Sequence, residues 1–406
     1  EFNASQDRVK VVNQSQGTSY DEVLRKYVAG IPSGDLPALA YLEDVSLKEV
    51  VDSGTLLPAE ACEQASDFEP GTLPVVRDYY TVDGTYWPGY INVSEPILYY
   101  NGTHLRAAGL DPAESPETLD ELRTMAEAVK EDGIASPLAL ILNRWFIESW
   151  ITGAGETVVN NGNGREGTAT ESTFDNPVTH EVYDWIKGMA DDDLLAGFSA
   201  TAGQINQYLA VAQQNSSLVL ETSTAATAIK AVLGGVTYDD AEGIDVGEID
   251  PSVIDVRSGP FPGLEEPAQV RVSGGYFAMT NTGTPEEQAA AWEFMRWMWE
   301  VPQQVTWHLQ GSYLPTTQAV AADPAVQEYW ETDLAGKMLK VAYDQLVQVD
   351  ASNQAPLIGP YTDYTEAIKT SLDRLVLEGA SVDEVIADAD AEIQDALDEY
   401  IEANEG

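Results

Sequence analysis

The sequence predicts an α/β protein of at least two domains, and three observations lead to that prediction. The chain has 406 residues, of which 44% are apolar, so it can bury a large core and exceeds the usual size of one domain. Continuous apolar runs of strand length, such as Leu138 to Leu142, alternate with stretches of helical periodicity, which is the pattern of doubly wound sheets. The 9 Trp and 19 Tyr residues indicate a folded chain, despite its high charge.

The charge of the chain is strongly negative and excludes some classes of partner. Lys and Arg together number 20 against 68 Asp and Glu, for a formal net charge of −48. A polyanion is repelled by nucleic acid and by anionic membrane surfaces, so neither is expected as a partner. We interpret the acids as a solvated surface suited to salty surroundings. The one cysteine, Cys62, can form no internal disulfide and is expected to pack as a small apolar side chain.

Periodicity and helix-start signals place the elements in order along the chain. Strands are expected at residues 9–12, 36–42, 96–101, 138–142, 217–220 and 273–280. Helices are expected at residues 20–28, 47–51, 103–109, 117–132, 176–191, 286–299, 302–311, 325–329, 333–346, 365–378 and 382–403. The run at 36–42 suits a buried parallel strand, 251–267 is predicted to be a linker, and 356–364 a loop.

Polar side chains stand where strands end, which is where doubly wound sheets bind ligands. Glu43 and Asp44 follow the strand at 36–42. Glu221 and Ser223 follow the strand at 217–220 and open a helix, where hydroxyls and free N–H groups can bind ligand oxygens. Helix capping accounts for these residues as well, so both interpretations stay open.

Aromatic side chains gather in residues 78–92, around an expected turn at Asp83–Gly84. Some of these rings must be ordinary core packing. One of Trp87 and Tyr90 is expected to reach a cleft, where a flat ring can stack on a flat-faced ligand.

The stretch from Ser273 to Thr317 combines several strong local signals. Its strand contains the pair Gly274–Gly275, which allows close backbone approach. Thr284 and Glu287 form a capping box for the helix that follows. Tyr313 lies just past a helix end and close to a proline, on a stiff extended segment that can present its ring to a cleft.

These motifs carry a resemblance to a known family. The glycine pair, the 286–299 helix, Trp307 and the Gly311–Pro315 segment resemble one block of the family-1 extracellular solute-binding proteins, the receptors of bacterial ABC importers for sugars and glycerol phosphates. Two further blocks are similar and stand in family order: Pro96–Asn101 with Ala108–Pro112, and Glu1–Ala4 with Tyr20.

The resemblance implies a two-lobed, periplasmic-binding-protein-like fold of type II. Members usually have a strand and helix before the Phe-Asn that here is residues 2–3, so the first strand and helix are expected to be missing from this chain. The implied lobes are residues 1–97 with 274–312, and 98–273 with 313–406. The hinge is expected near 96–101, 270–276 and 311–316, and ligand binding closes it.

The family's ligand positions map onto a set of residues here. Asn92 and Ser94 precede the crossing strand, and Trp145 follows the strand at 138–142. Its neighbour Arg144 could donate to a ligand hydroxyl or phosphate, but in so acidic a chain an ion pair with a surface acid is the expected role. The full predicted binding set is Tyr20, Glu43, Trp87, Asn92, Ser94, Trp145, Glu221, Ser223, Gly275, Tyr313, Tyr361 and Tyr364.

The nature of the ligand follows from one departure from the family pattern. The glycerol-3-phosphate type holds phosphate with an arginine shortly after the glycine that corresponds to Gly359. Here Tyr361 and Tyr364 occupy that segment and no basic residue does. A phosphate dianion without a charge partner is poorly held, so a neutral mono- or oligosaccharide is favoured. A glycerol-3-phosphate or glycerophosphodiester receptor is the alternative.

No catalytic constellation or metal motif appears in the sequence. The histidines are scattered at His104, His180 and His308, without metal-ligand spacing, so no cofactor and no metal site are expected. A glycoside hydrolase with paired carboxylates, and a structural surface protein, remain less favoured alternatives. The expected partners are a small sugar and the membrane subunits of an ABC transporter. The protein is expected to be a monomer in the cell envelope, lipid-anchored or periplasmic after signal removal.

Overall fold

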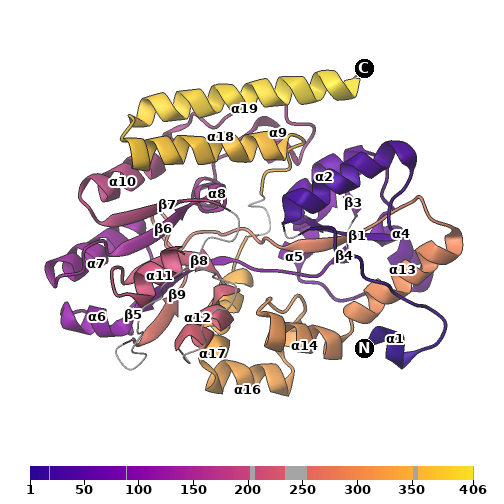
Figure 1. Cartoon of the computed structure of the whole chain (residues 1–406), viewed down its shortest axis with the longest axis horizontal. Helices are drawn as coiled ribbons and strands as arrows, with labels where there is room; N and C mark the ends of the chain where they lie inside the picture. The colour runs from indigo at the N-terminus through magenta and orange to yellow at the C-terminus, as the bar shows by residue number, and fades with distance from the viewer. Residues whose placement is uncertain (18, 88, 202–205, 234–253, 351–354, 406) are drawn as a thin grey trace.

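The computed structural model describes residues 1–17, 19–87, 89–201, 206–233, 254–350 and 355–405, and it confirms the α/β class. Figure 1 shows two lobes, each built around its own sheet. Strands β5 to β9 and most of the later helices form one lobe, and β1, β4, α2 and α13 lie in the other. We call these the large and the small lobe. The residue boundaries expected for the lobes stay a prediction.

The small lobe contains a three-stranded sheet in the order β1 (Leu39–Glu43), β10 (Gly275–Met279), β4 (Gly89–Tyr90). The prediction of a parallel strand at 36–42 is wrong, because β1 pairs antiparallel with β10. An apolar run does not encode the direction of its partner strand, and this partner, β10, comes much later in the sequence. Along β1, burial alternates, so Tyr41 and Glu43 share the half-buried face.

The large lobe contains a five-stranded mixed sheet in the order β7-β6-β8-β5-β9. Strand β6 runs parallel to β7 and β8, whereas β5 runs antiparallel to β8 and β9. Leu98 and Tyr100 point into one hydrophobic core, and Ile97 and Tyr99 point into the other. Both faces of this sheet are therefore covered. The strands are β5 (Pro96–Asn101), β6 (Leu138–Leu142), β7 (Leu195–Ser199), β8 (Leu218–Thr222) and β9 (Val256–Gly259).

Helices cover both sheets and largely follow the expected order. Three expectations are wrong: residues 9–12 form no strand, the expected linker contains β9, and α18 begins at Tyr361, four residues earlier than expected. Residues 251–253 of that linker lie outside the described residues. The helices used below are α2 (Tyr20–Gly30), α3 (Leu47–Asp52), α5 (Pro74–Tyr79), α7 (Leu119–Glu131), α8 (Arg144–Gly153), α9 (Asn160–Gly164), α13 (Pro285–Met298), α14 (Val301–Gly311), α16 (Pro324–Thr332), α18 (Tyr361–Asp373) and α19 (Val382–Glu405).

Three chain segments pass between the lobes close together. Ser94 and Ser273 pair through two backbone hydrogen bonds of 2.9 and 3.0 Å. The third segment joins them where the N–H of Leu314 donates to the carbonyl of Val93 at 2.7 Å. Within the described ranges, no helix is long and apolar enough to cross a membrane.

The crossing segment leaves no room for a side chain at residue 274, which gives a testable prediction. Gly274 has φ +151°, and a Cβ there would lie 2.2 Å from the carbonyl oxygen of Asn92. Gly133, with φ +113°, has open space around the same position. Gly274→Ala should therefore lower the free energy of unfolding by about 1–3 kcal/mol more than Gly133→Ala, measured by urea denaturation. Equal losses in the two variants would contradict the close approach.

Candidate functional site

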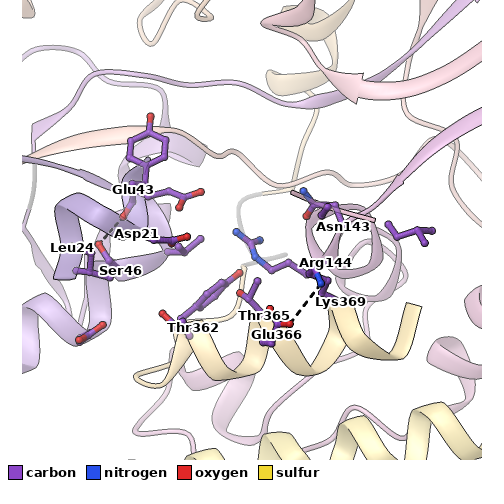
Figure 2. A pocket seen from close by; sticks show the side chains of 16 residues that line it. Asp21, Leu24, Glu43, Ser46, Asn143, Arg144, Thr362, Thr365, Glu366 and Lys369 are labelled. Carbon is purple, nitrogen blue, oxygen red and sulfur yellow. Dashed lines mark hydrogen bonds and ion pairs between the residues drawn. The ribbon is translucent and has the colours of Figure 1, made fainter. Parts of the chain in front are cut away.

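A cavity of about 310 Å³ lies between the two lobes. Figure 2 shows Asp21, Glu43 and Ser46 on one side of it, with Asn143 and Arg144 on the other. Asp21 comes from α2, Glu43 ends β1, and Ser46 lies in the short 3-10 helix that follows it. Asn143 directly follows β6, and Arg144 begins α8. The complete lining is Tyr20, Asp21, Leu24, Glu43, Val45, Ser46, Glu49, Leu142, Asn143, Arg144, Ala200, Tyr361, Thr362, Thr365, Glu366 and Lys369.

Two adjacent acids stand at the end of β1. Asp44 is buried and accepts hydrogen bonds from the hydroxyl of Tyr79, from Ser273 Oγ at 3.2 Å and from the N–H of Gly274 at 3.1 Å. Burial raises the pKa of Asp44. Burial, and next the neighbouring Asp44, raise the pKa of Glu43 to about 7. Glu43 therefore exchanges its proton near neutral pH.

A charged cluster in the large lobe faces these acids. The carboxylate of Glu148 is wholly buried and lies 3.0 Å from Arg144 Nη1 and 2.5 Å from Arg271 Nη1. The hydroxyl of Tyr361 donates to its other oxygen at 2.7 Å. The Arg144 guanidinium lies 4.7 Å from the centre of the Tyr361 ring. Arg144 was expected to pair with a surface acid; that prediction is wrong, since its partner is one helical turn away and points inward.

A second polar and aromatic group surrounds Tyr41 on β1. The hydroxyls of Tyr20 and Tyr41 lie 2.9 Å apart, and the Asn92 amide donates to Tyr41. Trp307 Nε1 donates to Asn92 Oδ1 at 2.9 Å, and the Tyr313 ring stacks on Trp307 with centroids 6.2 Å apart. The structure thus brings Tyr20, Asn92 and Tyr313 into one connected group.

Gly275 packs against the Tyr41 side chain of this group. A Cβ at Gly275 would lie 2.2 Å from the Tyr41 hydroxyl, so the glycine leaves room for that ring. Of the twelve residues predicted to bind ligand, Tyr20, Glu43 and Tyr361 line the cavity. The roles of all twelve in binding stay a prediction.

The other predicted residues engage the protein itself. Trp145 is buried, with Nε1 donating to the carbonyl of Arg271 at 3.2 Å. Trp87 Nε1 donates to the carbonyl of Val82, and Tyr90 is buried with its hydroxyl on Thr72.

Near the crossing strands, the predicted polar side chains hydrogen-bond to other segments of the same protein. Ser94 Oγ donates to the carbonyl of Ser273. Ser223 Oγ accepts from the N–H of Glu95 at 3.3 Å, and Glu221 accepts from Gln207 Nε2 at 2.9 Å. Tyr364 is buried in the core of the large lobe.

Two arginines near the site, the buried Arg271 and the half-buried Arg165, were not among the predicted residues. Arg271 lies between Val270 and Val272 in an apolar stretch, and in a chain with only 20 basic residues that placement was a usable signal of burial. Arg165 gave no such signal, because it follows the polar Asn160–Gly164 segment. In the part of the chain that the structure describes, no group of three or more His, Cys, Asp or Glu side chains could hold a metal ion.

Nearly the whole chain is similar to solute-binding proteins. Residues 1–333 match the family described as bacterial extracellular solute-binding protein. The chain is 26% identical to the sn-glycerol-3-phosphate-binding periplasmic protein UgpB of Yersinia pestis bv. Antiqua (strain Antiqua), over 89% of this chain and 77% of the relative.

Solved structures confirm the two-lobed fold. UgpB from Mycobacterium tuberculosis, in complex with glycerophosphocholine, superposes with a TM-score of 0.78 at 17% identity, over 98% of this chain and 93% of that chain. The cyclic alpha-maltosyl-1,6-maltose binding protein from Arthrobacter globiformis gives 0.74 at 19% identity, with the same coverage of both chains.

The raised pKa of Glu43 predicts a pH-dependent stability difference. Because the folded protein binds this proton more tightly than the unfolded chain, the stabilisation is complete below pH 4.5 and is lost as the pH rises through about 7. Glu43→Gln avoids that loss. The free energy of unfolding of Glu43→Gln minus that of the natural protein should therefore increase by about 1–3 kcal/mol between pH 4.5 and pH 8.5. Urea titrations of both proteins at each pH measure this difference. Glu131→Gln, exposed on α7, is the control, and a flat difference for Glu43→Gln would refute the prediction.

Proposed function

The chain belongs to the bacterial extracellular solute-binding protein family, and from that premise we propose that it captures a neutral mono- or oligosaccharide for an ABC importer. Members of this family are receptors and not enzymes. The proposal concerns the chemistry of the ligand, which family membership leaves open between sugars and glycerol phosphates.

The observation that carries the proposal is the charge of the cavity wall. Four carboxyl groups and two cations line the cavity: Asp21, Glu43, Glu49 and Glu366 against Arg144 and Lys369. Arg144 already shares its charge with the buried Glu148. A phosphate dianion would meet an acidic wall, whereas sugar hydroxyls can donate to carboxylates. The half-buried ring of Tyr20 adds a flat surface on which the C–H groups of a sugar can pack.

The position of the cavity suits capture by closure. Its lining comes from both lobes, so a ligand that binds Tyr20 and Glu43 on one side and Asn143 on the other favours the conformation in which the lobes approach. The importer's membrane subunits then recognise the closed form. The Arthrobacter globiformis protein, which its name describes as binding a cyclic maltosyl-maltose, has the same fold.

A second candidate is a glycerophosphodiester, and one observation favours it. The guanidinium of Arg144 lies over Tyr361, so a cation does stand beside the segment after Gly359 although that segment contains none. The UgpB relatives are named for binding glycerol 3-phosphate. We rank this candidate second because Glu148 neutralises part of the charge of Arg144 and Arg271.

Calorimetry with a small panel separates the two candidates. The panel is maltose, maltotriose, glycerophosphocholine and sn-glycerol 3-phosphate, each titrated into the protein at pH 7.5. Binding of a neutral sugar with no heat from the phosphate compounds is the expected result. Binding of glycerophosphocholine alone would establish the second candidate in its place.

Removing one hydroxyl tests the role of Tyr20 directly. Tyr20→Phe keeps the ring and removes the group that bonds Tyr41, so it should weaken binding of the sugar found in the panel about tenfold. Tyr329→Phe on α16, whose ring packs against His308, serves as the matched control and should bind as the natural protein does. Unchanged affinity of Tyr20→Phe would remove Tyr20 from the site.

A further inference from the structure

Arg165 belongs to the large lobe but hydrogen-bonds to the small one. It directly follows α9, and its neighbours Val158 and Val159 lie in the core of the large lobe. Its Nη1 donates to the carbonyl of Tyr79 at 2.8 Å and to that of Thr81 at 3.3 Å. Its Nε donates to the carbonyl of Ala355 at 2.9 Å. One guanidinium therefore joins segments of both lobes.

Of the two acceptors in the small lobe, the carbonyl of Tyr79 stands at the end of a helix, and Thr81 begins the short strand β2 (Thr81–Val82). Tyr79 is the last residue of α5, and the carbonyls in the last turn of a helix lack partners within it and carry partial negative charge. The guanidinium supplies both the donor and the opposite charge. It also lies 5.4 Å from the centre of the Tyr79 ring, within the range of a cation–π contact.

The backbone before Arg165 is held in an uncommon conformation. Asn161, Gly162 and Asn163 have φ of 54°, 59° and 59°, in the left-handed region. Asn163 Oδ1 accepts from the N–H of Val158 at 2.8 Å, and the Asn163 carbonyl accepts from the N–H of Leu357 at 2.8 Å. Such a conformation persists at non-glycine residues only where surrounding contacts fix it. Here the hydrogen bonds of Asn163 fix the backbone from which the Arg165 side chain extends.

The helix end that Arg165 binds is connected to the ligand cavity. The hydroxyl of Tyr79 donates to Asp44, which also accepts from the N–H of Gly274 in the crossing segment. Asp44 is adjacent to Glu43 in the cavity wall. The position of Tyr79 thus affects both the acids and the hinge.

We propose that Arg165 is a positioning residue for lobe closure, which holds α5 against the large lobe before any ligand binds. The proposal rests on the hinge closure of the proposed function but not on the identity of the ligand. Loss of the charged hydrogen bonds should shift the ratio of closed to open molecules toward open by about tenfold.

Small-angle X-ray scattering of the unliganded protein tests this proposal. Arg165→Ala should have a larger radius of gyration than the natural protein, with Arg165→Lys between the two because an ammonium can still reach one carbonyl. Arg106→Ala is the matched control, since Arg106 pairs with Asp255 within the large lobe, and it should leave the scattering unchanged.

Thermal unfolding separates opening from unfolding. A single cooperative transition in Arg165→Ala, together with the larger radius, supports the proposal. If Arg165→Ala does not fold, the radius of gyration of Arg165→Lys is compared with that of the natural protein instead. A larger radius supports the proposal, and an equal radius contradicts it. Superposable scattering curves for a folded variant and the natural protein would overturn it, whatever ligand the calorimetry identifies.

Discussion

The carboxylate of Glu148 is the group on which the large-lobe side of the cleft depends. It is wholly buried and binds Arg144, Arg271 and Tyr361, which come from α8, the crossing segment and α18. Removing one partner of such a buried group leaves an uncompensated charge, which costs several kcal/mol, about 3–5. The arrangement therefore fixes the three segments relative to one another. Arg144 and Tyr361 can then face the cavity in a defined position.

The small lobe is tied to this cluster through its own buried acid. Asp44 accepts hydrogen bonds from α5, through Tyr79, and from the crossing segment at Gly274. The crossing segments are hydrogen-bonded to one another. Away from the crossing, the hydroxyl of Tyr400 on α19 donates to Asp52 of α3 at 2.8 Å. Polar contacts of this kind, which can separate and reform at modest cost, therefore accompany the apolar core that residues of both lobes share.

Local signals in the sequence located elements well and contacts poorly. The bounds of β5 and β6 were predicted to the residue because apolar runs end sharply at Asn101 and Asn143, and the capping box of α13 is confirmed by both of its hydrogen bonds. The start of α18 was missed because Gly359–Pro360 was interpreted as loop, although proline commonly begins a helix. The hydrogen bonds of Arg165 to main-chain carbonyls could not be predicted from the sequence, because every residue has a carbonyl and no pattern marks which one accepts.

The electrostatics of the cleft explain why a protein of net charge −48 buries arginines there. Arg144 and Arg271 share one carboxylate, so their cluster keeps a single positive charge that faces Glu43 and Asp44. With its pKa raised to about 7, Glu43 can be a carboxylate or a carboxylic acid at neutral pH. A hydroxyl can donate to the first and accept from the second, so a neutral polyol is matched in both states. Under the proposed function, binding of a phosphate would weaken as the pH rises and these acids lose their protons, whereas binding of a neutral sugar would not. This difference is the electrostatic argument behind the proposal of a ligand without charge.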